Sequence, residues 1–197
     1  MPDLAATLFT STGLVALAEM GDRTQLLSVL LAARYRRPVP IIAGVAVATL
    51  ANHALAAWAG AALANWFAGP AFRTLVGLGF LATAAWLLVP DKPDDAPPTP
   101  RGGLFLTTLV AFFLAEIGDK TQIATIGLGA RFGDAPVDVL AVTLGTTLGM
   151  MLANVPAVLL GDRLLARLPL RFLQRLAAVL MAALGLAMVW QAVGPLR

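Results

Sequence analysis

The sequence predicts an all-α membrane protein of six transmembrane helices, arranged as two inverted three-helix repeats. Three observations lead to this prediction: an apolar composition, charge-free runs long enough to cross a bilayer, and an acidic motif that occurs twice. Of the 197 residues, 59% are hydrophobic and 13% are charged, and the mean hydropathy is +0.82. A soluble domain carries about 25% charged residues, so the composition indicates an integral membrane protein.

The composition also narrows the class of function. The chain has no cysteine, which excludes a disulfide framework, a thiolate nucleophile and a cysteine-based metal site. Its formal net charge of +3 is spread over loops, without the basic block that would indicate a nucleic-acid partner. The N-terminal stretch MPDLAATLFTSTG lacks a positive region and a clear cleavage site, so we expect a retained first span rather than a signal peptide.

Charge-free runs locate the helices. A helix needs about 20 residues to cross about 30 Å of hydrocarbon, and four runs approach or exceed that length. These runs are Val39–Phe72, Thr74–Pro90, Val139–Gly161 and Leu176–Leu196. Two further spans, Leu4–Ala33 and Gly103–Ala130, are expected if the polar motifs inside them are tolerated. Six helices result.

An eight-residue motif divides the chain into two halves. AEMGDRTQ, which begins at Ala18, returns 97 residues later as AEIGDKTQ, which begins at Ala115. The stretch PDKPDDAPPTPRGG predicts a linker at 90–102, between a first repeat at 1–89 and a second at 103–197. Three spans in each half force the second half to enter the membrane from the opposite side. Such inverted repeats are typical of secondary transporters, whose ion site lies near the midplane where the repeats meet.

The loop charges predict the orientation. The loops after the first, third and fifth spans carry Arg34, Arg36, Arg37, Lys92, Arg101, Arg163, Arg167, Arg171 and Arg175. The opposite side carries only Arg73, Arg131 and Arg197. By the positive-inside rule, the first set is cytoplasmic and both termini lie outside. We expect a bacterial inner (plasma) membrane protein.

Both motifs place acids near the bilayer centre. One ionised side chain there costs about 3 kcal/mol on insertion scales, so these groups must face a protein interior, water, one another or a cation. On a continuous helix, the acids and the amide of each motif fall on one stripe. The two stripes consist of Glu19, Asp22 and Gln25, and of Glu116, Asp119 and Gln122. Together they form a hard, all-oxygen ligand set that suits Ca²⁺, Mg²⁺ or Mn²⁺.

The basic residues of the motifs leave a structural alternative open. Arg23 and Lys120 each lie four residues after a motif glutamate, so Glu19–Arg23 and Glu116–Lys120 could be simple ion pairs within one helix. That alternative leaves the two aspartates without obvious partners. It also gives no reason for the motif to occur in both halves.

Uncharged residues near the acids could support the ion site. Thr24 and Thr121 point away from the acidic stripes on a continuous helix. The motif glycines leave room for a neighbouring helix, or for a local break that frees backbone carbonyls. Asn52 and Asn154 occupy roughly equivalent places in the two halves and could line the ion path or pack between helices. His53, the single histidine, could sense protons, bind metal or hydrogen-bond between helices.

The pattern E-x-G-D-[KR]-[ST], present as EMGDRT and EIGDKT, resembles the duplicated signature of the Golgi, chloroplast and bacterial manganese and calcium transporters known as uncharacterised protein family 0016. The resemblance covers essentially the whole chain. It implies exchange of Mn²⁺ or Ca²⁺ for protons, with no permanently bound cofactor. It also implies that Glu19, Asp22, Glu116 and Asp119 lie in the ion path, supported by Gln25, Gln122, Thr24 and Thr121.

We therefore predict a secondary transporter that exports a divalent cation, with Mn²⁺ favoured and Ca²⁺ next, in exchange for protons. Its partners would be the metal ion and the lipid bilayer, with no nucleic acid, and oligomerisation stays open. The alternatives are a small-solute exporter or a passive cation channel of the same architecture, or a membrane metalloenzyme. A hydrolase is disfavoured because the chain has two serines, one histidine and no cysteine, without a nucleophile–base spacing.

Overall fold

The computed structural model describes residues 3–89, 99, 102–161 and 168–193, and these residues form eight α-helices. The helices are α1 (Leu4–Ala18), α2 (Arg23–Tyr35), α3 (Pro38–Trp66), α4 (Pro70–Leu87), α5 (Leu104–Glu116), α6 (Lys120–Phe132), α7 (Pro136–Leu160) and α9 (Leu170–Val193). The predicted all-α class is confirmed. Most of the predicted linker at 90–102 lies outside the described residues.

Local sequence explains where the long helices begin. Proline stands in the first turn of α3, α4 and α7, where its missing N–H removes no helical hydrogen bond. At the start of α1, the Asp3 carboxylate accepts a hydrogen bond of 3.0 Å from the backbone N–H of Ala5. Proline and the Asp3 cap therefore mark the starts of these four helices, and Pro70 begins α4 inside the charge-free run Val39–Phe72.

Length and composition support four membrane spans, or five. Among the described helices, α3, α4, α7 and α9 are long and apolar enough to cross a bilayer alone. The pair α1 and α2 meets the same criteria as one span that is bent by 68° at its break. α5 is apolar but has only 13 residues, so the second motif segment does not count as a continuous span on length and composition.

Neither motif lies on a continuous helix, and of the two roles that the sequence left open for the motif glycines, the structure shows the local break. α1 ends at Ala18 and α2 begins at Arg23, while α5 ends at Glu116 and α6 begins at Lys120. The physical reason is the glycine of each motif, because Gly21 and Gly118 both adopt a left-handed backbone with φ of +78°. The single stripe predicted for each motif required an unbroken helix, and it does not exist across the breaks.

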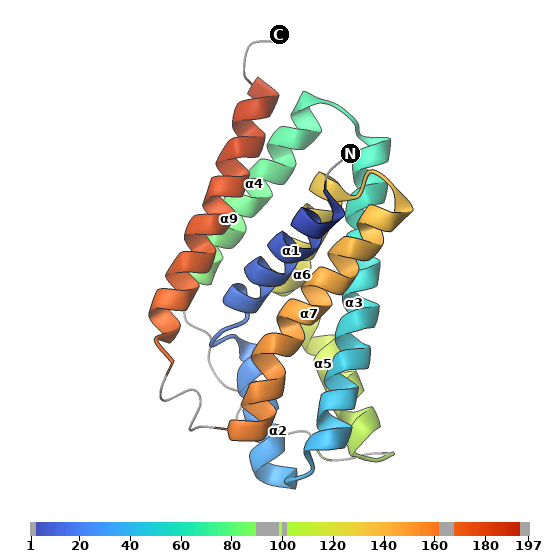
Figure 1. Ribbon diagram of the computed structural model, residues 1–197, viewed down its shortest axis with the longest axis vertical. Coiled ribbons are helices and arrows are strands. Elements are labelled where there is room, and N and C mark those ends of the chain that lie inside the picture. The colour runs from blue at the N-terminus through green and yellow to red at the C-terminus, as the bar shows by residue number, and fades with distance from the viewer. Residues whose placement is uncertain (1–2, 90–98, 100–101, 162–167, 194–197) are drawn as a thin grey trace.

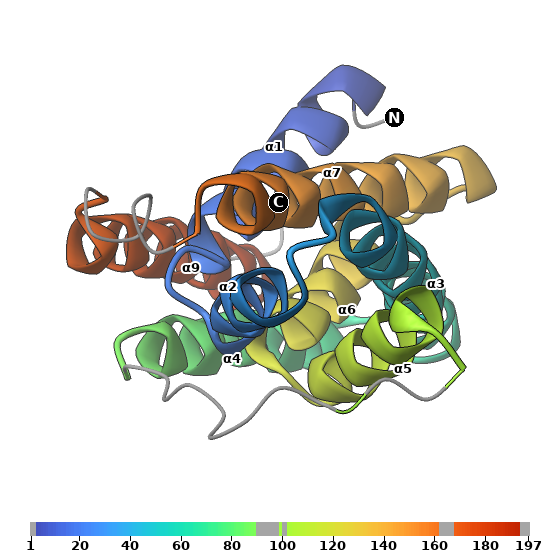
Figure 2. The same cartoon turned by 90° about the horizontal axis from the view of Figure 1, so that it is seen from below.

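The two halves of the chain run in opposite directions. In Figure 1, α1 and α2 descend in turn from the upper end, whereas α5 and α6 ascend from the lower end. Figure 2, which views the bundle from below, shows α4 and α9 on one side, α3 and α5 on the other, and α2 and α6 between them. Extensive contacts join α4 to α9, α1 to α7, and α3 to α5 and α6. Each half therefore packs mainly on the other.

Two apolar clusters enclose the level of the breaks. The larger joins α1, α4, α6 and α9 around buried residues such as Leu14, Phe80, Leu128 and Met181. The smaller joins α2, α3 and α5 around residues such as Leu31, Ile41 and Phe112. Ala18 and Ala115, which directly precede the motif glutamates, pack in the larger and the smaller cluster respectively. Polar groups in such a place must find partners inside the protein.

Glycine at helix contacts sets the spacing of the bundle. A Cβ added at Gly149 of α7 would lie 2.5 Å from the carbonyl oxygen of Thr12 and 2.8 Å from the amide nitrogen of Ala16, both backbone atoms of α1. Gly129 of α6 approaches the backbone of Ala57 in α3 in the same way. Small residues at such contacts let helices approach closely, which is how membrane helices gain packing energy.

We expect the substitution Gly149→Ala to lower the free energy of unfolding by about 1–3 kcal/mol, because the added methyl forces α1 and α7 apart. Thermal unfolding of the purified protein in detergent measures the effect. Gly13→Ala in α1 is the matched control, since a Cβ there meets no atom within 4 Å. Equal stability of the two variants would contradict the close approach of α1 and α7.

Candidate functional site

The four motif carboxylates lie at the two helix breaks. Glu19 directly follows α1 and Glu116 is the last residue of α5, and both side chains are completely buried. Asp22 and Asp119 stand at the N-termini of α2 and α6, where neither carboxylate caps its own helix. The positive end of a helix dipole favours negative charge at this position. Broken helices of this kind are a common way to build an ion site inside a membrane.

At each break, a glutamine side chain accepts a hydrogen bond from the backbone N–H of the motif glycine. The backbone N–H of Gly21 donates to Gln25 Oε1 at 2.7 Å, and that of Gly118 donates to Gln122 Oε1 at 2.6 Å. The amide oxygens that the sequence suggested as metal ligands are thus used to satisfy backbone groups freed by the breaks. In the arrangement that the structure shows, Gln25 and Gln122 stabilise the local backbone.

The threonine of each motif donates a hydrogen bond to the glutamate of the same motif. Thr24 Oγ1 donates to Glu19 Oε1, and Thr121 Oγ1 donates to Glu116 Oε2 at 2.8 Å. The prediction that these threonines point elsewhere is wrong, because the break turns the chain and brings position 24 or 121 back over the glutamate.

Asparagines of the long helices contact the motifs directly. Asn154 of α7 donates from Nδ2 to Glu19 Oε1 at 3.2 Å and accepts at Oδ1 from Ser28 Oγ at 2.6 Å. In the other half, Asn52 of α3 accepts a hydrogen bond from Gln122 Nε2. Each asparagine therefore joins a long helix to a broken one. Ser28 was missed by the sequence reasoning, although it lies one helical turn after Thr24 and so on the same face of α2.

An ion pair links the two halves at the motifs. Lys120 Nζ lies 2.6 Å from Asp22 Oδ1, and both side chains are buried, with exposed fractions of 2% and 0%. The alternative of a Glu116–Lys120 pair within one helix does not describe this contact, because the helix starts only at Lys120. Arg23, which occupies the equivalent position of the first motif, is exposed. The two halves therefore place the same motif position differently.

Each motif glutamate keeps one buried oxygen without a hydrogen-bond partner among the residues that the structure describes. These atoms are Glu19 Oε2 and Glu116 Oε1. A buried polar atom without a partner is rare and calls for an explanation, such as a site for a proton or a cation. Among the described residues, however, no three His, Asp or Glu side chains are grouped closely enough to hold one metal ion. The four carboxylates thus meet at one level but do not surround a common point.

The second motif is the more accessible of the two. In the first motif, Glu19, Asp22 and Gln25 are completely buried. In the second, Asp119 and Gln122 are half-buried, and the backbone around Gly118 is exposed. His53 is also completely buried in α3, and neither ring nitrogen has a hydrogen-bond partner among the described residues. The structure gives His53 no place among the motif contacts.

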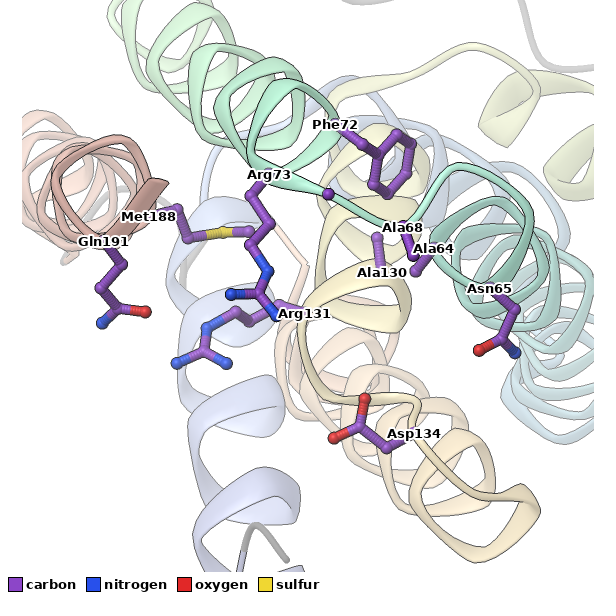
Figure 3. Close-up of a pocket in the computed structure, with 11 residues that line it drawn as sticks. Ala64, Asn65, Ala68, Phe72, Arg73, Ala130, Arg131, Asp134, Met188 and Gln191 are labelled. Carbon is purple, nitrogen blue, oxygen red and sulfur yellow. The ribbon is translucent and has the colours of Figure 1, made fainter. Parts of the chain in front are cut away.

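A separate pocket lies away from the motifs, near the end of the bundle where α3 and α6 end. It has a volume of about 330 Å³ and is lined by residues of α3, α4, α6 and α9. Figure 3 shows the side chains of Arg73 and Arg131 extending into it, with Asp134 and Gln191 at its edge. No motif residue lines this pocket, so the buried cluster at the breaks and not this cavity is the candidate site.

Comparison with known proteins gives a consistent set of relatives. The family model described as "Divalent cation/proton antiporter GDT1" matches the chain in two parts, residues 7–95 and 104–195. A protein of Vibrio cholerae serotype O1 named "Putative manganese exporter" is 49% identical over 182 residues, which cover 92% of this chain and 90% of that protein. A GDT1-like protein of Synechocystis is 27% identical, covering 79% of this chain and 82% of that protein. No solved structure matches.

Proposed function

Because the chain belongs to the divalent cation/proton antiporter family GDT1, we propose that it exports Mn²⁺ across the bacterial plasma membrane in exchange for protons. The family consists of transporters, so the metalloenzyme alternative is set aside. Export and the preference for Mn²⁺ over Ca²⁺ rest on the name of the Vibrio cholerae relative. The oxygen-only chemistry of the motifs is compatible with either ion.

One observation carries the proposed site. Glu19 and Glu116, from opposite halves of the chain, are both completely buried, and within the described part of the chain each keeps one oxygen without a hydrogen-bond partner. We infer that these two oxygens, with Asp22 and Asp119, receive the transported cation. Loading then requires the carboxylates to move together, since no three of them surround one point in this arrangement. The hydrogen bonds that Thr24, Thr121 and Asn154 donate to the glutamates would limit how far each can move.

The architecture that we propose has six spans in two inverted repeats, at 1–89 and 103–197. The bent pair α1 and α2 forms the first span and α5 with α6 forms the fourth. The opposite directions of these pairs in Figure 1 support the inversion. The end of the bundle at which α2 ends and α3 begins carries Arg34, Arg36 and Arg37, and we place it in the cytoplasm. Both termini then lie outside.

The charge of the site explains why cation and protons would exchange. Four carboxylates accompanied by one buried ammonium leave an excess of negative charge, which is costly inside a membrane. A divalent cation reduces that excess, and protons bound by the same oxygens reduce it as well. Because both ligands use the same oxygens, binding of one opposes binding of the other. A site that carries less charge when loaded than when empty would cross the membrane loaded more readily than unloaded.

Neutralising one glutamate should separate an ion site from a structural cluster. We expect Glu19→Gln and Glu116→Gln each to reduce Mn²⁺ export at least tenfold, equivalent to about 1.4 kcal/mol or more, in a protein that still folds. Flux into inverted vesicles at matched protein levels is the measurement. Asp134→Asn, which changes an exposed acid outside the motifs, is the control and should export normally. Normal export by both glutamine variants would leave the motifs a structural role only.

Coupling can be tested with the pure protein in liposomes that contain a pH-sensitive dye. We expect a Mn²⁺ gradient to drive protons in the opposite direction, and the apparent Mn²⁺ affinity to fall as pH is lowered from about 8 to 6, because protons occupy the same carboxylate oxygens. A passive channel would pass Mn²⁺ without moving protons against their gradient. Mn²⁺ flux with no proton movement at any pH would exclude the exchange mechanism.

The orientation can be tested because the chain has no native cysteine. Arg37→Cys and Asn65→Cys place single thiols at exposed positions at opposite ends of α3. In intact cells, a membrane-impermeant maleimide should label position 65 and leave position 37 unlabelled until the cells are opened. The reverse pattern would place the arginine-rich end outside.

A further inference from the structure

The most unusual charge in the protein is the ammonium of Lys120. Its side chain is only 2% exposed at a helix break, and its ion pair with Asp22 is the contact that joins the charged groups of the two halves. A lysine at this depth is costly unless it is paired, and long basic side chains near membrane surfaces normally extend toward water instead. The ion pair with Asp22 offsets part of the cost of burying Lys120.

The repeat provides an internal comparison. Arg23 occupies the equivalent position of the first motif, follows the same E-x-G-D sequence, and begins α2 as Lys120 begins α6. Its side chain is nevertheless exposed. The helix start alone does not dictate burial of the basic residue, so the inward position of Lys120 is a property of the charge cluster around it.

The ammonium lies where a transported cation would bind. Its nitrogen is 2.6 Å from an oxygen of Asp22, which is close to the distance at which Ca²⁺ binds carboxylate oxygens. A divalent cation on that oxygen and the ammonium at the same place would repel each other strongly in a medium of low dielectric constant. In agreement with this, the carboxylates are not gathered around a common point while Lys120 is among them.

We propose that Lys120 is an internal cation that occupies the unloaded site, so that the transported ion must displace its ammonium from Asp22 in order to bind. This proposal rests on the proposed function and specifies a residue that sets the affinity of its site. Lys120 lowers the affinity for the divalent cation and partly neutralises the site after the cation has left and before protons bind. It therefore favours turnover over tight binding.

The test is the equilibrium affinity of the full-length protein for Mn²⁺ in detergent at fixed pH, read from free Mn²⁺ by electron paramagnetic resonance. We expect Lys120→Met, which removes the charge at similar length, to bind Mn²⁺ at least tenfold more tightly than the original protein. Lys120→Arg, which keeps a cation, should bind within threefold of the original. Arg23→Met is the matched control from the exposed repeat position, and it should also stay within threefold.

A merely structural role for Lys120 predicts the opposite sign, because loss of a buried partner would disorder the site and weaken binding. Unchanged or weaker binding by Lys120→Met would overturn the proposal, and so would equal tightening by Lys120→Arg. Size-exclusion profiles and thermal unfolding confirm that each variant is folded. If Lys120→Met does not fold, Lys120→Gln replaces it under the same criteria.

Flux measurements separate this proposal from the proposed function. In liposomes, Lys120→Met should exchange Mn²⁺ for protons at least tenfold more slowly, because Mn²⁺ leaves the tighter site slowly when no ammonium is present to replace it. Exchange as fast as in the original protein would overturn the role in turnover. If the original protein neither binds nor moves Mn²⁺, the proposed function itself fails, and that result does not depend on any Lys120 variant.

Discussion

The constraint on which the rest of this structure depends is the cost of leaving polar groups without partners inside a membrane. Both motifs break a helix at a glycine, and each break releases backbone groups that the helix no longer pairs, at a buried place in the first motif and a more exposed one in the second. The glutamine four residues after each glycine accepts from the freed N–H at 2.7 Å or 2.6 Å. With the backbone satisfied in this way, the carboxylates at the breaks are available for other contacts.

Helix packing brings the two breaks together. Glycine and alanine contacts let α1 approach α7 and let α3 approach α6, so that Asn154 and Asn52 reach the motifs from the long helices. The apolar clusters on either side of the breaks hold this level of the bundle in place. A polar site of this kind needs rigid surroundings, because small displacements would leave buried carboxylates without their donors.

The two halves are alike in backbone and different in charge placement. The glycine conformation, the glutamine that closes the break and the threonine on the glutamate occur in both. The basic residue does not follow the repeat, since Lys120 is buried against Asp22 while Arg23 is exposed. The half-buried Asp119 contrasts in the same way with the completely buried Asp22. Repetition thus accounts for the scaffold of the site, and the differences between the halves account for its electrostatics.

The sequence by itself determined the membrane class, the long apolar helices and the importance of the two motifs. Those features follow from composition and from spacing along the chain, and they can be recognised without knowing which residues lie close together in the folded protein. The sequence alone did not determine that Thr24 and Thr121 donate hydrogen bonds to the glutamates. These contacts depend on the helix breaks at Gly21 and Gly118. Only the tertiary structure decided that Lys120 pairs with Asp22, since the two residues are far apart in the chain and belong to helices of opposite direction. Helical spacing predicts contacts only between residues of one helix. The partner of a buried charge depends on which residues of other helices pack beside it.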